Sequence, residues 1–290
     1  MHKLMPTFLD TLKVGFLSEI TKRVIKDRDL NLEIRENYLN IYYKGNSLLR
    51  LTEKSPQCYH PYVHPKILNG IQLPDFTDKA SVDHFMRNIP AIKDNIVLLG
   101  KPSLEIEYEQ MIIRANNQEP RNNSEYFIVD RQVTAGKAGR FDLTGLFWER
   151  NGRKRGQTVP LCLFEVKFAL NQDIQDVDQQ LKRYYLAIRE KASELAEETE
   201  GIFRQKLELG LFRHPADRLE AMKTLKFSRD IDDFQFILIL VDYNPYSSLY
   251  KLDRLAKLSF AGQIKIFRGG FAMWEKEFKS LAEANLSPVE

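Results

Sequence analysis

The stretch that decides the fold is Leu161–Phe168, which reads LCLFEVKF. Its length and apolar composition predict a buried β-strand. Because successive side chains of a strand point to opposite faces, Glu165 and Lys167 share one face. The other face is wholly apolar and carries Cys162, Phe164, Val166 and Phe168. A carboxylate and an ammonium on a buried strand cost desolvation free energy unless a partner, such as a metal ion, compensates them.

The preceding β-type segment, residues 140–149, places one more acidic residue, Asp142, in a similar setting. A hairpin between the two strands brings Asp142 beside Glu165. Two carboxylates with water form an oxygen-only ligand set, which suits Mg²⁺ or Mn²⁺ better than Zn²⁺. The sequence therefore predicts a site for a hard divalent cation.

A helix is expected after this strand, because apolar residues recur there at intervals of three and four. Its apolar stripe consists of Ile174, Val177, Leu181, Tyr184, Tyr185 and Ile188. Gln180 and Tyr184 stand four residues apart and so lie on one face of the helix. Both side chains are expected to lean towards the site.

The order of elements around this centre predicts an α/β fold with a mixed sheet flanked by helices. We expect helices at 80–96, with a break at Pro90, and at 104–115. The remaining elements are expected as strands at 126–133, 140–149 and 161–168, the helix just described, a strand at 234–242, a helix at 248–258 and a strand at 263–268.

The motif residues together resemble the PD-(D/E)xK nuclease superfamily, which has the restriction-endonuclease-like fold. Asp142 matches the aspartate of the second core strand, and Glu165-Val166-Lys167 matches the ExK of the third. Residues 180–184 look like the QxxxY motif of the RecB-like branch. Phe141 stands where the name of the motif has proline. The resemblance covers roughly residues 104–268.

What the resemblance implies is phosphodiester hydrolysis with a bound Mg²⁺ or Mn²⁺. It implies that Asp142 and Glu165 hold the metal and that Lys167 positions or helps to deprotonate the attacking water. Gln180 and Tyr184 join the catalytic set. The family's further acidic residue, from the first core helix, matches either Glu105 or Glu109, and the sequence leaves both open.

The residues before this region predict a separate accessory unit. Apolar spacing over residues 6–28 favours an amphipathic helix, and short β-type runs at 30–35, 38–43 and 47–52 favour a meander. Five Pro or Gly residues within 53–78 favour a connector. We therefore divide the chain into an N-terminal helix and β-meander unit, 1–78, and a nuclease-like domain, 79–290.

Composition sets outer limits on function. With 43% hydrophobic and 29% charged residues the chain is an ordinary globular protein, and a net charge of +3 does not by itself announce a nucleic-acid partner. No apolar run approaches the length of a membrane span, and the first residues do not resemble a secretory signal. With only two cysteines, we expect a reduced, cytoplasmic protein. Cys58, His60 and His64 lack a fourth zinc ligand nearby, which favours ordinary loop residues.

The turn between the two site-bearing strands is basic, with Arg150, Arg153, Lys154 and Arg155. Such a turn is often only solvated, but beside a metal site we expect it to contact phosphates. The partner implied by the resemblance is DNA rather than RNA. The rival interpretation is a catalytically silent nucleic-acid-binding or interaction protein that keeps the fold. A homo-oligomer and a larger nuclease or defence complex both stay open.

Overall fold

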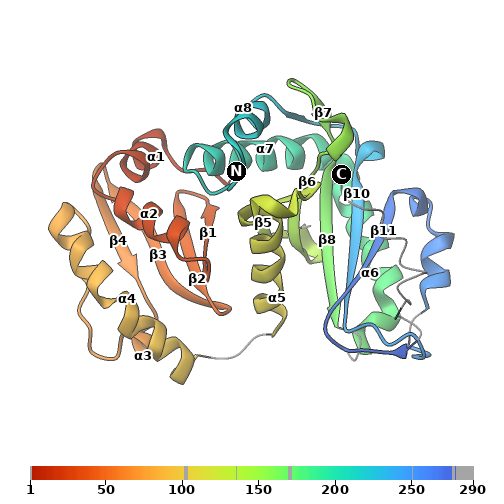
Figure 1. Cartoon of the computed structure of the whole chain (residues 1–290), viewed down its shortest axis with the longest axis horizontal. Helices are drawn as coiled ribbons and strands as arrows, with labels where there is room; N and C mark the ends of the chain where they lie inside the picture. Colours follow the sequence, from red (N-terminus) through yellow and green to blue (C-terminus); the bar gives the residue numbers. More distant parts are fainter. Residues whose placement is uncertain are drawn as a thin grey trace.

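The computed structural model describes residues 2–100, 104–134, 136–168, 172–249, 251–275 and 278. These residues form a mixed α/β structure in which two larger sheets lie on either side of helix α5 (Figure 1). A small parallel pair, β7 with β9, completes the strands of the described region. The predicted α/β class is confirmed.

The first sheet is a four-stranded antiparallel meander in chain order. Its strands are β1 (Leu30–Arg35), β2 (Tyr38–Tyr43), β3 (Asn46–Ser55) and β4 (Cys58–Tyr62). The helices of this part of the chain are α1 (Pro6–Lys13), α2 (Ser18–Lys26), α3 (Pro65–Leu68) and α4 (Lys79–Leu99). Alternate strand residues such as Leu32, Ile34 and Leu39 join Phe8, Ile20 and Phe85 from the helices in one apolar core.

Three local predictions for this region were wrong. Residues 6–28 form two helices, and the chain turns between them at Gly15, where an added Cβ would meet Thr11 Cα at 2.8 Å. Helix α4 runs through Pro90 without a break, because the proline lies on the exposed face while Phe85 and Ile92 keep the other face packed. The stretch 53–78, which we expected to be a connector, contains strand β4. Helix α4, which follows it, packs on α3, β3 and α2.

The second sheet has the order β11-β10-β8-β6-β5. The strands are β5 (Tyr126–Thr134), β6 (Arg140–Phe147), β8 (Leu161–Phe168), β10 (Gln235–Val241) and β11 (Ile264–Gly269). Strands β5, β6 and β8 are antiparallel neighbours, and β10 and β11 add in parallel to β8. As predicted, Cys162, Phe164 and Val166 share one apolar cluster, while Leu161 and Leu163 belong to the other.

Helices lie on both faces of this sheet. They are α5 (Leu104–Ile113), α6 (Val177–Ile188), α7 (Ala192–Glu208) and α8 (Ala216–Met222), and the short strands are β7 (Thr158–Val159) and β9 (Lys226–Phe227). Helix α7 was not predicted, although Ala192, Ala196 and Thr199 repeat at helical spacing and are buried. Residues 252–257 form a 3₁₀ turn rather than the expected α-helix.

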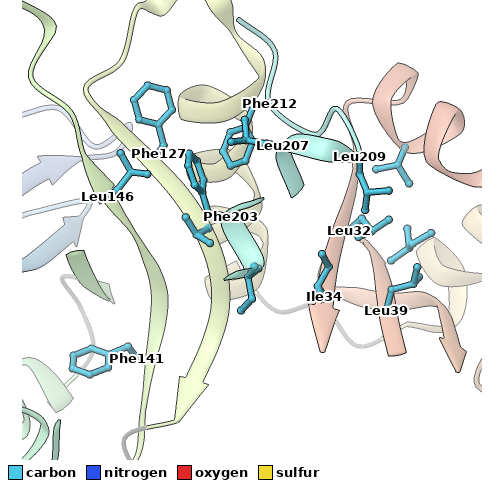
Figure 2. Packing of buried hydrophobic residues seen from close by; sticks show 14 of the residues in the cluster. Leu32, Ile34, Leu39, Phe127, Phe141, Leu146, Phe203, Leu207, Leu209 and Phe212 are labelled. Carbon is cyan, nitrogen blue, oxygen red and sulfur yellow. The ribbon is translucent and has the colours of Figure 1, made fainter. Parts of the chain in front are cut away.

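The two sheets are joined by apolar and charged contacts. Figure 2 shows Phe203 and Leu207 of α7, with the following Leu209, between Phe127 of the second sheet and Leu32 of the first. Buried ion pairs lie at the same junction, namely Lys206 Nζ with Glu33 Oε2 at 2.7 Å, and Arg35 with Asp130. Arg35, with His2 and Lys206, outweighs the effect of burial and holds the pKa of Asp130 at about 2.

The described helices include none that combines the length and the apolar character required to cross a bilayer.

Candidate metal centre and active site

Strands β6 and β8 separate at the candidate site. The last paired residues of their ladder are Leu143 and Phe164, and Asp142 and Glu165 are the next residues beyond that pair. Both carboxylates are buried, with 7% and 2% of their surface exposed. The Val166 N–H donates to Asp142 Oδ2 at 2.7 Å, which fixes the aspartate across the opening. The predicted juxtaposition of two carboxylates therefore occurs where the strands diverge.

Helix α5 brings two more carboxylates to Asp142. One carboxylate oxygen from each of Glu105, Glu109 and Asp142 lies within 4.8 Å of the others. The sequence left Glu105 and Glu109 as alternatives, and the helix delivers both because they stand one turn apart. Glu165 is not one of these three, although its charge acts on Asp142. Such a group of oxygens is suited to holding a metal ion.

Glu109 is held in place by strand β5. Arg131 donates from Nε and Nη2 to Glu109 Oε2 at 2.8 and 2.6 Å, and Gln132 Nε2 donates to Oε1 at 3.0 Å. Arg131 is itself 2% exposed. Arg131 and Gln132 were not among the site residues predicted from the sequence. The sequence does contain a signal for them. Asp130-Arg131-Gln132 places polar residues inside an apolar strand, as Glu165 does in its own strand.

Glu165 has one satisfied and one unsatisfied oxygen. Its Oε1 accepts from Lys167 Nζ at 2.7 Å and from Gln180 Nε2 at 2.6 Å. Its Oε2 is buried and has no hydrogen-bond partner among the described residues. A buried carboxylate oxygen without a partner costs free energy, which a cation bound at that oxygen would offset.

Helix α6 supplies the side chains that orient Glu165. Gln180 Nε2 also donates to Tyr184 Oη at 2.7 Å, and Tyr184 Oη donates to the Arg140 carbonyl at 2.9 Å. Gly139 lets this tyrosine approach, because a Cβ at that position would lie 3.0 Å from the ring and its φ is +123°. Gln180 and Tyr184 thus contact the site as the sequence predicted, as positioning groups behind Glu165.

The site contains more carboxylates than cationic side chains. The pKa values of its buried carboxylates are raised. Burial first, then the charge of Glu165, raises the pKa of Asp142 to about 8. Burial also raises the pKa values of Glu165 and Glu109, against the opposing effects of Lys167 and Arg131. Burial would lower the pKa of Lys167, but Glu165 raises it, so the lysine stays charged. Without a cation the site therefore holds protons that a divalent ion would displace.

The basic turn is not part of this cluster. It follows the end of β6 at which Leu146 pairs with Leu161, whereas Asp142 and Glu165 lie at the opposite end of the two strands. Arg153 is bound to the protein itself, donating to the carbonyls of Trp148 and Ser124 and to the Asn123 side chain. The side chains of Arg150, Lys154 and Arg155 are exposed. The structure does not bring these four residues to the carboxylates.

Comparison of the chain with protein-family models, with curated proteins and with solved structures finds no match. Clustered carboxylate oxygens, a charged lysine and an ordered glutamine fit a hard cation together with a negatively charged substrate.

Proposed function

We propose that this protein is a nuclease of the PD-(D/E)xK type that uses Mg²⁺ or Mn²⁺ to hydrolyse phosphodiester bonds of DNA. The observation that carries the proposal is the meeting of Glu105, Glu109 and Asp142 beside the Glu165–Lys167 pair. Metal-binding carboxylates next to a fixed ammonium are the equipment for attack of water on a phosphate diester.

The arrangement of the second sheet supports a restriction-endonuclease-like architecture for this domain. A helix, α5, precedes three antiparallel strands, and the chain then passes through α6, α7, α8 and the short strand β9 before it reaches the parallel strand β10. The motif resemblance also implies a mixed sheet with flanking helices, and this agreement supports the proposal. The motif residues also fall on the elements to which the resemblance assigns them, with Asp142 on β6 and Glu165 and Lys167 on β8.

The side chains of the site have three kinds of role in this proposal. Asp142, Glu165 and the two glutamates of α5 would hold the cation, which when bound acts as a Lewis acid and lowers the pKa of water. Lys167 directs a positive charge to the phosphate and the attacking water. Arg131 and Gln180 orient Glu109 and Glu165, so that these carboxylates keep their positions during turnover.

The proposal is tested by incubating the full chain with labelled single-stranded DNA, duplex DNA and RNA of one sequence. Cleavage of DNA is expected with Mg²⁺ or Mn²⁺ and none with EDTA. Glu165→Gln is expected to lower the rate by about 10²-fold or more, whereas Glu107→Gln, on α5 but outside the carboxylate group, should match the wild type. Cleavage in EDTA, or equal rates in both variants, contradicts the proposal. A chain that binds DNA but never cleaves it supports the catalytically silent alternative.

Lys167→Ala is expected to separate catalysis from metal binding. Removing the ammonium from beside Glu165 takes away a positive charge, so Mn²⁺ should bind as well as before or more tightly. The rate of cleavage should fall by about 10²- to 10³-fold, because the lysine acts on water and phosphate. Isothermal titration with Mn²⁺ and single-turnover cleavage measure the two quantities. Loss of Mn²⁺ binding in this variant would make Lys167 a structural partner of the carboxylates.

A further inference from the structure

The outer face of the first sheet, opposite its apolar core, is divided into two halves. The side chains of Asn31, Glu33 and Arg35 on β1 are buried at the junction with the second sheet. The outer face of β3 and β4 carries exposed side chains instead, including Arg50, Lys54, His60 and Tyr62. This second part, defined by Tyr38, Arg50, Thr52, Lys54, His60 and Tyr62, is called the open half below.

The open half is polar, cationic and aromatic. A shallow hollow of about 560 Å³ is lined by Arg50, Thr52, Lys54, His60 and Tyr62, with no carboxylate in the lining. The Arg50 guanidinium lies 4.2 Å from the centre of the Tyr38 ring, and no carboxylate pairs with it within the described part of the chain. Asp75, beyond the lining, contacts Lys54 Nζ at 3.1 Å and His60 Nδ1 at 2.8 Å. The Tyr62 side chain is 48% exposed.

The open half is linked to the metal centre through Tyr42. This residue lies on β2 on the same face as Tyr38, and its ring centre is 4.7 Å from the guanidinium of Arg131. Arg131 in turn holds Glu109, one of the three clustered carboxylates. Strand register sets Arg50 opposite Tyr62, so the hollow lies one to two strand spacings, about 5–10 Å, from β2.

We propose that the open half binds a single strand of nucleic acid and leads its backbone towards the metal centre. An exposed tyrosine ring and an arginine plane provide surfaces on which unpaired bases stack, and Arg50 and Lys54 provide the charge for phosphates. Paired bases in a duplex do not offer their faces to such a surface. The inference deepens the proposed function, on which it rests for the identity of the substrate.

Binding is tested with the full chain in EDTA, which prevents metal-dependent cleavage, by fluorescence anisotropy on labelled dT₁₅ from low to moderate salt. Tyr62→Thr is expected to weaken binding by about tenfold. Arg50→Thr with Lys54→Thr should reduce the slope of log affinity against log salt by about 1.4, at about 0.7 for each contact with a single strand. Arg50→Lys should leave the slope of log affinity against log salt unchanged, because the positive charge is kept. The variant should bind dT₁₅ more weakly, because the planar guanidinium is lost.

The matched control is the basic turn at the far end of the second sheet. Arg150→Ser with Lys154→Ser removes the same charge from two exposed positions and should leave the dT₁₅ slope unchanged. Unaltered binding in the Tyr62 and Arg50 variants, or tighter binding of a duplex that depends on the turn, overturns the proposal. Circular dichroism of the Tyr62→Phe and Tyr62→Thr variants checks that the sheet remains folded.

A small substrate keeps the two proposals distinguishable. Thymidine 5′-(p-nitrophenyl phosphate) offers one phosphate diester and a single nucleoside, so it tests the metal centre without a strand of bases to stack along the open half. With Mn²⁺ it should be hydrolysed equally by the wild type and by the Arg50, Lys54 and Tyr62 variants. No hydrolysis by any of them, with dT₁₅ binding still dependent on Arg50 and Tyr62, would end the nuclease proposal and keep the binding surface. Hydrolysis without that dependence would do the reverse.

Discussion

Asp142→Asn is expected to reduce DNA cleavage by about 10³-fold or more and, in EDTA at pH 8, to make the folded protein more stable. Activity falls because the amide is a poorer ligand for a hard cation than the carboxylate it replaces. Stability rises because burial disfavours the charge of Asp142 and the nearby carboxylates repel it, while Asp142 forms no salt bridge in the described region. A neutral amide of the same size removes that repulsion.

The stabilisation expected from Asp142→Asn depends on pH. The pKa of Asp142 is raised to about 8 in the folded chain from the ordinary aspartate value of 3.8. Between these values the folded state holds a proton that the unfolded state has released, so the wild type loses stability as pH rises through this window. The amide of the variant has no such proton to lose, and the stabilisation by Asp142→Asn should grow from pH 5 to pH 8, reaching about 1–3 kcal/mol.

Urea denaturation in EDTA at pH 5 and pH 8 measures this difference, and Mn²⁺ in place of EDTA should stabilise the wild type but not the variant. Asp253→Asn, which changes an exposed aspartate, is the control and should alter neither stability nor cleavage. If the stability of the variant fell with pH as steeply as that of the wild type, Asp142 would not be the group that causes the loss of stability. Full cleavage activity would remove Asp142 from the site.

Lys206→Met is expected to lower the free energy of unfolding by about 3 kcal/mol. The ammonium of Lys206 lies 2.7 Å from Glu33 Oε2, and the two side chains are 5% and 0% exposed. Removing the lysine leaves a buried carboxylate with only the amide of Asn31 at 2.6 Å and Arg35 at 4.0 Å. Glu33→Leu in the same chain removes that stranded charge and should restore much of the loss.

An exposed ion pair joins the same parts of the chain and provides the comparison. Lys13 Nζ lies 2.8 Å from Glu208 Oε2, with the two side chains 33% and 47% exposed. Lys13→Met should therefore cost less than about 1 kcal/mol. A double-mutant cycle for each pair, measured by urea denaturation, isolates the two coupling energies. Equal costs for Lys13→Met and Lys206→Met would mean that the buried pair does not hold the first sheet against α7.

The centre of the site could be predicted because it depends on local periodicity. The two-residue period of a strand assigns Glu165 and Lys167 to one face, and the helical period sets Gln180 beside Tyr184. Both relations hold in the structure. They need no knowledge of how separate elements pack.

The parts that escaped prediction depend on packing between elements. Nothing in the spacing of Glu109 and Arg131 says that α5 lies against β5, so their ion pair could not be foreseen. The position of the basic turn depends on strand direction, because a turn that follows one end of a hairpin is remote from residues at the other end. At Pro90 the local sequence predicts a break in the helix. The packing of Phe85 and Ile92 overrides this local preference, and the helix continues.

The buried pair between Glu33 and Lys206 can form only late in the synthesis of the chain. Its members are 173 residues apart in the chain, and the mutual contacts of Leu4 and Gln205 span 201 residues. At ribosomal rates of about 5–20 residues per second, Lys206 is added to the chain roughly 10–35 s after Glu33. During that interval Glu33 lacks the ammonium of Lys206, and the strand edge of β1 is open to other chains. The buried contacts between the first sheet and α7 therefore form only after more than two thirds of the chain has been made.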